Sequence, residues 1–534
     1  MSERPWHKFY DPQVPVSLHF PKIPLKELFR RNVMDFPDKP YLIINDTELT
    51  YGTVNTLVNG LANYLLSIGL KKGDRVPQYV IGFHACTKAG FIIVPTNFMY
   101  TKSELEHIFT DSQPKAVVVL DMFAQNVIEL HNSGIYKFEK ILIAKLPSMS
   151  TDVPPCDAAV DLNEAITSLN DYSEPDIEVF PDDIAMLQYT GGTTGVSKGC
   201  CLTNANVVSM GLQTTTCISV GCPMSEVKTL AAIPLYHIYG QNTNINVCLF
   251  SGGSMVLVPN PSDPMNLLEA IRKHKPTVRA AVPAMIIGIN NHPETPNYNV
   301  GSIKVIVGGS APVPVETIRK FEEISGGRII EGYGLSETSN VLTVNPFHRR
   351  KVGSVGIPMP DTDIKIVDLE TGTKEMPIGE PGELIARGPQ VMKEYWQNPE
   401  ETSIAIRDGW LYTGDIAIMD EDGYITIVDR KKDMIICSGF NVYPRDIDEV
   451  LYSHPKVLEA CTIGVPDEKR GESPKAYVVL KEGETATADE LIAFCREKLT
   501  AYKVPKYIEF IDSLPRTQVG KPDRKALKAM ALGQ

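Results

Sequence analysis

Apolar residues in this chain gather in short continuous runs that stop at glycine, proline or a hydroxyl residue. Such runs occur at residues 116–120, 231–234, 255–259, 280–283 and 305–309. Continuous Val, Ile and Ala runs of this length are typical of strands that are buried on both faces of a sheet. Between them, helical spacing of apolar residues marks the stretches 57–68, 264–274 and 315–324. The alternation predicts an α/β architecture for the first part of the chain.

The pattern changes near residue 363. Short strands with alternating polarity follow at 363–368 and 424–429, with a glycine-rich turn at 377–382. Alternation of this kind indicates antiparallel strands with one buried face. We therefore expect a β-rich subdomain over about residues 350–431, within a large N-terminal domain of stacked α/β sheets that covers residues 1–431.

The last hundred residues have a compact pattern of their own. A strand is expected at 476–480, a helix after Thr487, and a final strand at 507–511. Glu490 lies three residues after Thr487, which is the spacing of a capping box, and an apolar stripe follows on the helix. The pattern predicts a small, mobile α+β C-terminal domain over residues 432–534.

Composition and charge limit the function. The 534 residues include 65 acidic and 52 basic ones, giving a net charge of −13, which is the wrong sign for a protein that binds nucleic acid. A polyanionic ligand would need basic groups concentrated locally. The 10 cysteines have no metal-binding spacing, and no apolar stretch suits a transmembrane or secretory segment. We expect a cytoplasmic location; peripheral membrane contact and a homodimer stay open.

The strongest chemical signal follows the apolar run 184–187. The segment 189–199 combines backbone donors from glycines, side-chain donors from hydroxyls and one cation, as a polyphosphate clamp requires. The lysine is not placed as in a Walker A loop, which disfavours a P-loop NTPase. A flexible glycine-rich turn is the structural alternative. The candidate polyphosphate ligands in it are Thr190, Gly191, Gly192, Thr193, Thr194, Gly195, Ser197 and Lys198.

Ligands of open α/β sheets bind beyond the carboxyl ends of the strands, which directs attention to the residues after the apolar runs. The segment 331–338 places Tyr333 between two glycines, so its ring can lie against a base, and Glu337 can supply a hard oxygen ligand to Mg²⁺. Asp415 stands on a glycine turn and can accept both hydroxyls of a ribose. Three further segments, 429–433, 438–441 and 515–521, are basic or glycine-rich. Each is weak alone and suits a plain turn or a solvated face equally well.

In this order and spacing, the segments resemble the acyl-adenylate-forming superfamily of acyl-CoA synthetases, luciferases and peptide-synthetase adenylation domains. The resemblance extends over about residues 25–525 and is closest to medium- or long-chain fatty acid CoA ligases. It implies an ATP site that includes the loop above together with Gly309, Ser310, Ala311, Glu331, Gly332, Tyr333, Asp415 and Arg430.

The resemblance also implies catalytic and substrate-binding roles. Lys521 matches the catalytic lysine, Glu337 the Mg²⁺ ligand, and Ser336 takes the place of a phosphate-binding threonine. Lys432 matches the hinge between the domains. The acyl pocket is implied at His237, Gly308 and Gly334, and the CoA tunnel at Ser438 and Gly439. For His237, a satisfied core histidine remains an equal alternative.

Two positions depart from the family pattern. Ser197 stands where many members have proline, and Val76 runs directly into Pro77, where members usually carry a further strand and turn. The second departure is either a real deletion or a gap in the sequence, and it affects the N-terminal subdomain only.

The sequence therefore predicts an ATP-dependent acyl-CoA synthetase with Mg²⁺ as cofactor and ATP, CoA and a carboxylic acid as substrates. The acid-site candidates carry no lysine or arginine, which favours a monocarboxylic fatty or aromatic acid, and a fatty acid is the first choice. An aryl acid CoA ligase is the alternative, and a non-catalytic nucleotide-binding regulator is a further one. An amino-acid-activating domain is disfavoured because His237 stands where an acidic partner for the amine is expected, and a luciferase-like oxygenase stays open.

Overall fold

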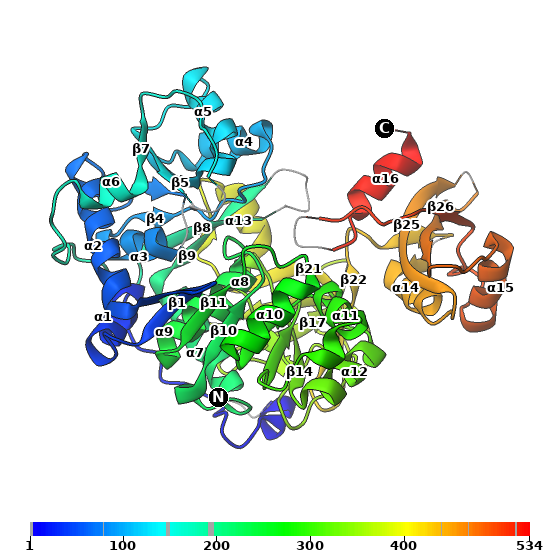
Figure 1. Cartoon of the computed structure of the whole chain (residues 1–534). Helices are drawn as coiled ribbons and strands as arrows, with labels where there is room; N and C mark the ends of the chain where they lie inside the picture. The colour runs from blue at the N-terminus through cyan, green and yellow to red at the C-terminus, as the bar shows by residue number, and fades with distance from the viewer. Residues whose placement is uncertain are drawn as a thin grey trace. The chain divides into compact units, whose positions relative to one another are not determined.

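The computed structural model describes residues 4–77, 80–145, 150–190, 197–438, 440–467, 469–517 and 521–533. The chain divides into two compact units (Figure 1). Unit 1 comprises Met1–Val352, Gly356–Asp363 and Arg387–Leu411; unit 2 comprises Gly353–Val355, Ile364–Ala386 and Tyr412–Gln534. The β-rich segment thus groups with the C-terminal residues. The predicted domain boundary at residue 432 stays a prediction.

The largest sheet of unit 1 is mainly parallel, as the continuous apolar runs indicate. From β14 to β1 neighbouring strands are parallel, and the outer strands are antiparallel. In spatial order the strands are β16 (Ile357–Pro358), β15 (Thr343–Val344), β14 (Arg328–Tyr333), β13 (Val305–Gly308), β12 (Val278–Ala281), β10 (Lys228–Ala231), β11 (Ser254–Leu257), β1 (Pro40–Ile44) and β2 (Thr47–Thr50).

Helices cover both faces of this sheet. One face packs on α10 (Pro264–His274), α11 (Pro283–Asn291) and α12 (Val315–Ser325), whose buried residues share a core with Leu230 and Ile306. The other face packs on helical segments around Met210 and Tyr239. These segments are α7 (Asn204–Ser219), α8 (Ile238–Gln241), the π-helical turn η4 (Asn242–Asn246) and α9 (Val247–Ser251). Both faces are therefore buried.

Two smaller sheets complete the N-terminal part of unit 1. One has the order β19 (Glu394–Tyr395), β9 (Lys198–Thr203), β8 (Ile184–Thr190), β4 (Ile92–Ile93) and β3 (Arg75–Val76). The other is parallel, with β5 (Ala116–Leu120), β6 (Lys140–Ala144) and β7 (Ala159–Asp161). The remaining helices of unit 1 are α1 (Leu25–Asp35), α2 (Tyr51–Ser67), α3 (Val80–Ala89), α4 (Lys102–Ser112), α5 (Ala124–Asn132), α6 (Leu162–Thr167) and α13 (Pro399–Ala405).

Unit 2 contains antiparallel strands followed by an α+β segment. The first sheet has the order β17 (Asp363–Val367), β18 (Gly382–Arg387), β21 (Trp410–Met419) and β20 (Ile406–Arg407), with β22 (Ile425–Arg430) also on β21. The ends of β17, β18 and β21, and all of β20, belong to unit 1. The second sheet consists of β24 (Phe440–Val442), β23 (Ile435–Cys437), β26 (Gly471–Leu480), β25 (Val457–Asp467) and β27 (Tyr507–Phe510). Its helices are α14 (Pro444–Tyr452), α15 (Ala488–Lys498) and α16 (Arg524–Leu532).

The expected fold class is confirmed, and most expected elements are present within a few residues. The Thr487 side chain caps α15, accepting from the Glu490 backbone N–H at 3.2 Å. The expectation of a strand at 231–234 was wrong, because β10 ends at Ala231. Ala232 and Ile233 are buried outside the sheet, so their apolar character reflects packing rather than strand pairing.

Candidate active site

The predicted polyphosphate loop connects two antiparallel strands of unit 1. Its first residue, Thr190, ends β8, and Lys198 begins β9. Ser197 closes the loop: its hydroxyl donates to the Thr190 carbonyl oxygen at 2.8 Å, and His107 Nε2 donates to the Ser197 carbonyl oxygen at 2.8 Å. The predicted ligands Gly191, Gly192, Thr193, Thr194 and Gly195 lie outside the described residues.

The lysine of this loop and the glutamate of the second motif meet at one tyrosine. Strand β19 pairs with β9 so that Tyr395 stands opposite Cys200. The Tyr395 hydroxyl donates to Glu337 Oε1 at 2.8 Å, and the Lys198 ammonium lies 5.4 Å from the centroid of the same ring. Burial and the charge of Glu337 raise the pKa of Tyr395 well above its usual value, so the hydroxyl stays a donor.

Lys198 also has an acidic partner. The side chain of Lys198 is only 12% exposed and forms an ion pair with Glu401 on α13. Helix α13 is fixed at its start by the Asn398 side chain, which accepts from the Glu401 N–H at 3.1 Å. Sequence reasoning missed both Tyr395 and Glu401. Neither belongs to a recognisable motif, and only the pairing of β19 with β9 reveals them.

Glu337 lies on a tight turn whose glycine is sterically required. A Cβ on Gly334 would lie 1.5 Å from the Asn340 carbonyl oxygen, so no other residue fits there. The turn Ser336–Thr338 is closed by a hydrogen bond from the Leu335 N–H to the Thr338 hydroxyl, at 2.9 Å. The Glu337 carbonyl oxygen accepts from the Met392 N–H at 2.7 Å. Ser336 and Glu337 are thereby held side by side.

The predicted adenine-binding residues lie together at the carboxyl ends of β13 and β14. Gly308 is paired with Glu331, which is 7% exposed and accepts from the Val313 N–H at 3.1 Å. Ser310 has a φ of +71°, a strained backbone conformation for a residue with a side chain. Tyr239 packs here as well: a Cβ on Gly309 would lie 3.3 Å from its ring. Gly332 and Tyr333 pair with the antiparallel strand β15.

His237 begins the helix that covers this edge of the sheet. It is the N-cap of α8, and its Nδ1 accepts from the Tyr239 N–H at 3.2 Å, which leaves the proton on Nε2. The Tyr239 hydroxyl in turn contacts the Val307 carbonyl oxygen and accepts from the Ala281 N–H at 3.2 Å. His237 therefore has a structural role as a cap, and its role in an acyl pocket stays a prediction.

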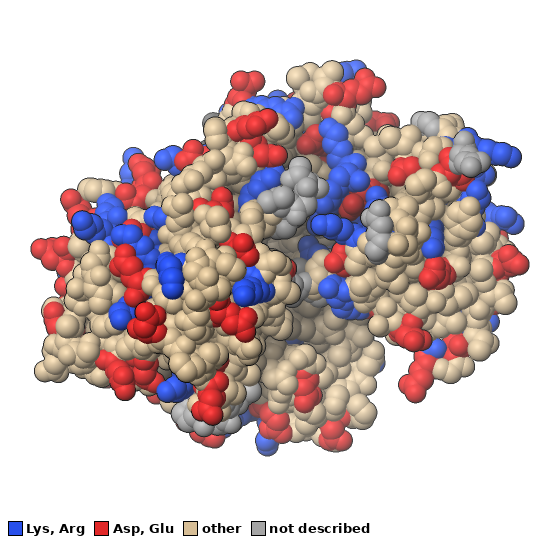
Figure 2. All heavy atoms as spheres, turned by 90° about the horizontal axis from the view of Figure 1, so that it is seen from above, with Lys and Arg blue, Asp and Glu red and all other residues tan. Residues whose placement is uncertain are grey.

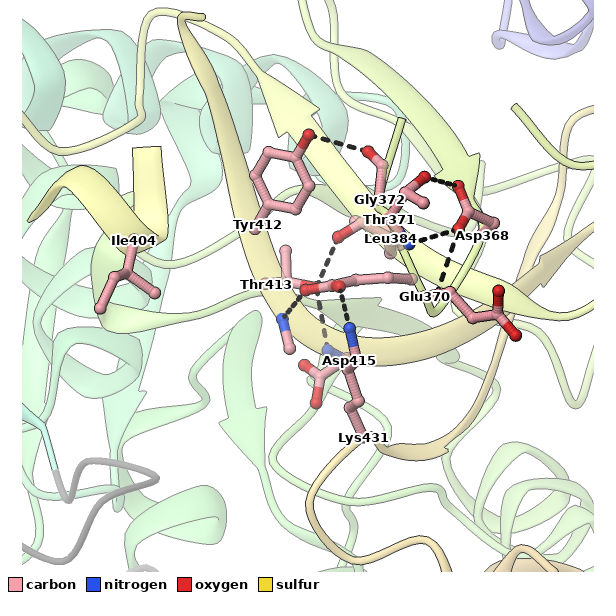
Figure 3. A network of polar contacts seen from close by, with 12 residues as sticks. Asp368, Glu370, Thr371, Gly372, Leu384, Ile404, Tyr412, Thr413, Asp415 and Lys431 are labelled. Atoms are coloured by element: carbon pink, nitrogen blue, oxygen red, sulfur yellow. Dashed lines mark hydrogen bonds and ion pairs between the residues drawn. The ribbon is translucent and has the colours of Figure 1, made fainter. Parts of the chain in front are cut away.

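In unit 2, Asp415 and Arg430 face each other across a strand pair. They are register partners on β21 and β22, and their side chains form an ion pair at 3.9 Å. Glu383 holds the Gly414 turn by accepting from its N–H at 3.1 Å and from the Lys431 ammonium at 3.0 Å (Figure 3). Asp415 is thus presented on a rigid turn, as a ribose ligand requires.

Lys521 lies in the same unit as the Asp415–Arg430 ion pair, and the charges of both residues affect its pKa. Its backbone closes a short loop with Thr517, whose N–H donates to the Lys521 carbonyl oxygen at 2.7 Å. Burial, and secondly the charge of Arg430, lower the pKa of Lys521 to about 8, while Asp415 opposes that effect. Asp415 and Arg430 form an ion pair in unit 2, and Lys521 of the same unit is close enough for both charges to affect its pKa.

The predicted hinge and CoA residues lie near this group in the sequence. Lys432 is in the turn after β22, where the N–H groups of Asp433 and Met434 both donate to the Arg430 carbonyl oxygen. Ser438 has a φ of +53°, and its N–H donates to the Arg470 carbonyl oxygen at 2.8 Å. Gly439 lies outside the described residues. The roles of all three residues stay predictions.

Two places offer side-chain atoms that could bind a metal ion, and they differ in whether those atoms are available. Glu337 offers one carboxylate, next in sequence to Ser336, which fits Mg²⁺ held by one protein carboxylate together with substrate phosphates. Among the described residues, His131, Cys156 and Asp157 also cluster. Both nitrogens of His131 are already used there, because Nδ1 accepts from the Phe138 N–H and Nε2 contacts Asp157. That second cluster therefore stabilises the fold and is not suited to a metal.

Comparisons with known proteins agree with this geometry. The family model "AMP-binding enzyme" matches residues 29–396, and "AMP-binding enzyme C-terminal domain" matches residues 446–521. A long-chain-fatty-acid–CoA ligase of Bacillus subtilis (strain 168) is 40% identical, covering 98% of both chains. The crystal structure of ATP-bound MatB from Rhodopseudomonas palustris is 31% identical and covers 95% of this chain and 99% of its own, with a TM-score of 0.83. The anthranilate CoA ligase AuaEII with anthranoyl-AMP is 26% identical and covers 97% and 99%, with a TM-score of 0.86.

The chain belongs to the AMP-binding enzyme family, as the motifs predict. Within that family the expected reaction class is also confirmed: the chain is an AMP-forming acid–thiol ligase, an ATP-dependent acyl-CoA synthetase. No helix of the described residues is long and apolar enough to cross a membrane. On the face seen in Figure 2, acidic and basic side chains are interspersed over most of the surface.

Proposed function

We propose that this enzyme converts a medium- or long-chain fatty acid to its CoA thioester in two steps. In the first step a carboxylate oxygen attacks the α-phosphorus of ATP, and the bond to pyrophosphate breaks. In the second step the CoA sulfur attacks the acyl carbon, AMP leaves, and the thiol loses its proton. The observation that carries the proposal is the meeting of Lys198 and Glu337, from separate motifs, at Tyr395.

In the first step the residues of unit 1 bind and orient the pyrophosphate part of ATP. Lys198 supplies a positive charge, and Ser336 supplies a hydroxyl donor. Glu337 would hold Mg²⁺, which supplies positive charge to the phosphate oxygens when bound. Tyr395 orients Glu337 by donating to its Oε1, so the carboxylate keeps one direction before ATP arrives. Glu331 and Ser310 shape the proposed adenine pocket.

The residues of unit 2 act on the other end of the nucleotide. Asp415 would accept the ribose hydroxyls, and Arg430 forms an ion pair with that carboxylate. Lys521 would bridge the acid oxygen and the α-phosphate during adenylation, where one positive charge is worth about 10²- to 10³-fold in rate. Ser438 and Gly439 would line the path of the CoA thiol in the second step, after a rotation about Lys432.

No lysine or arginine is among the nearest described neighbours of the proposed acid site. Gly308 lies next to Val313, Ile329 and the acidic Glu331, and Gly334 lies next to Asn340 and Val341. Such a lining favours a hydrocarbon chain over a second carboxylate. A near-full-length relative named as a long-chain fatty acid ligase supports this choice. An aryl acid is the second candidate, because a structural neighbour is named as an anthranilate CoA ligase.

The test is pyrophosphate release with CoA present, over straight-chain acids of graded length, benzoate, anthranilate and a dicarboxylate. We expect medium or long fatty acids to give the highest kcat/KM, since each buried methylene adds about 0.8 kcal/mol. Omission of Mg²⁺ and the Lys521→Ala variant are the controls. A maximum at acetate or at the dicarboxylate would refute the fatty acid proposal, and a maximum at an aromatic acid would favour the second candidate.

A further inference from the structure

Helix α4 of unit 1 contacts both ends of the predicted polyphosphate loop. The loop leads from Thr190, the last residue of β8, to Ser197, which directly precedes β9. Helix α4 lies far from the loop in the sequence and packs beside α5 (Figure 1). The motifs include no residue of α4, and the proposed function gives this helix no role.

The first contact is at the end of the loop. His107 Nε2 on α4 donates to the Ser197 carbonyl oxygen at 2.8 Å, across 90 positions of the sequence. The Ser197 hydroxyl donates to the Thr190 carbonyl oxygen at 2.8 Å, which joins the two ends of the loop. His107 therefore holds the residue directly before Lys198, the cation that the proposed function places on the pyrophosphate part of ATP.

The second contact is at the start of the loop. Tyr189 directly precedes Thr190, and its hydroxyl donates to the Asp111 carboxylate on α4. Tyr189 is the register partner of Gly199, and a Cβ on that glycine would lie 3.2 Å from the tyrosine ring. The glycine thus leaves room for the ring that reaches α4. Asp111 lies four positions after His107, so the two side chains share one face of the helix.

Helix α4 is itself fixed at both ends. Its first turn has a capping box, in which the side chains of Thr101 and Glu104 each accept from the backbone N–H of the other residue. At the other end Arg75 Nε donates to the carbonyl oxygen of the last helical residue at 2.5 Å, and Trp396 Nε1 donates to the Asp111 carbonyl oxygen at 3.3 Å. A shift of the helix relative to the loop would break these bonds, so α4 is a firm support.

We propose that His107 and Asp111 are positioning residues, which hold the two ends of the polyphosphate loop in the conformation that binds the β- and γ-phosphates of ATP. Each acts through the loop and not on the substrate. A loop that is held in place before binding loses less conformational entropy, so these bonds should favour ligands that occupy it. AMP lacks the pyrophosphate part, so its binding should depend little on them. This inference rests on the proposed function, which assigns the pyrophosphate part of ATP to this loop.

The test compares ligands with and without the pyrophosphate part, by calorimetric titration in the presence of Mg²⁺. We expect His107→Leu and Asp111→Leu each to weaken binding of the non-cleavable analogue α,β-methylene-ATP about fivefold to tenfold, as the loss of one hydrogen bond predicts, and to change AMP binding less than about twofold. His107→Gln keeps a donor and Asp111→Asn keeps an acceptor, so both should restore most of the affinity. Thr110→Ala, at an exposed position of the same helix, is the matched control and should change neither value.

A smaller substitution guards against misfolding, with the melting temperature as the check. Tyr189→Phe removes only the hydroxyl that donates to Asp111, and adding it to Asp111→Leu should weaken binding no further, because both changes remove the same bond. Equal weakening of the analogue and of AMP in the folded variants, or unchanged binding of both, would overturn the inference. If inorganic pyrophosphate does not compete with the analogue for the wild-type enzyme, the assignment of the loop in the proposed function has failed instead, so the two failures are distinguishable.

Discussion

The proposed role of Lys521 predicts that adenylation depends on pH. Burial and Arg430 lower the pKa of its ammonium from 10.5 to about 8. A lysine carries its charge below its pKa, so the charge needed for adenylation is present below pH 8 and is lost as the pH rises through 8. With the ordinary lysine pKa of 10.5, the charge would be lost only above pH 10. We therefore expect ATP–pyrophosphate exchange, which reports the first step alone, to fall about tenfold for each pH unit above 8.

Two substitutions test the cause of this dependence. Lys521→Arg keeps the charge at all accessible pH values, so whatever activity it retains should be flat between pH 7 and 10. Arg430→Met removes the second-largest cause, so at saturating ATP the fall should move to higher pH, though not to the ordinary lysine value, because burial remains the larger cause. Exchange that stays constant from pH 7 to 10 in the wild type, or a Lys521→Arg variant with the same fall, would refute the reasoning.

Three further predictions follow from single contacts. Tyr395→Phe leaves Glu337 without its 2.8 Å donor, so we expect a weaker apparent Mg²⁺ affinity in exchange assays and an unchanged melting temperature; an unaltered Mg²⁺ titration would exclude this role. Arg524 pairs at about 3 Å with the buried carboxylates Asp429 and Asp448, so Arg524→Ala should lower the free energy of unfolding, measured in urea, by about 3 kcal/mol. Arg319→Ala, which removes an exposed ion pair, should not lower it, and equal losses in the two variants would contradict the burial argument. Lys432→Pro should slow thioester formation from supplied acyl-AMP more than adenylation in single-turnover assays, and equal slowing of both would argue against a hinge there.

Sequence predicted those parts of the site in which local chemistry determines the structure. Gly334 illustrates this: the turn that presents Glu337 admits no side chain, so the glycine and the glutamate appear together in the sequence. Thr487 is a second case, because the cap and the residue that donates to it are three positions apart. In both, the contact partners lie within six positions of each other, and residue spacing is sufficient to recognise them.

Contacts between distant segments could not be predicted in this way. Tyr395 reaches Glu337 only because β19 pairs with β9, and the two residues are 58 positions apart. The run 231–234 shows the reverse problem. Its apolar residues are buried, but Ala232 and Ile233 pack outside the sheet, and burial alone does not distinguish a strand from the loop that follows it.

The charges of the site also explain how a protein of net charge −13 can bind a polyanion. Two of its cations lie beside acidic partners: Lys198 pairs with Glu401 in unit 1, and Arg430 pairs with Asp415 in unit 2. Each cation is therefore ordered before ATP arrives, so little conformational entropy is lost on binding. In the proposed site the phosphates would compete with Glu401 for Lys198, and this competition would lower affinity while leaving the lysine in place. A site of this kind favours correct positioning for the reaction over tight binding of ATP, which is what a two-step enzyme requires when it must also release AMP.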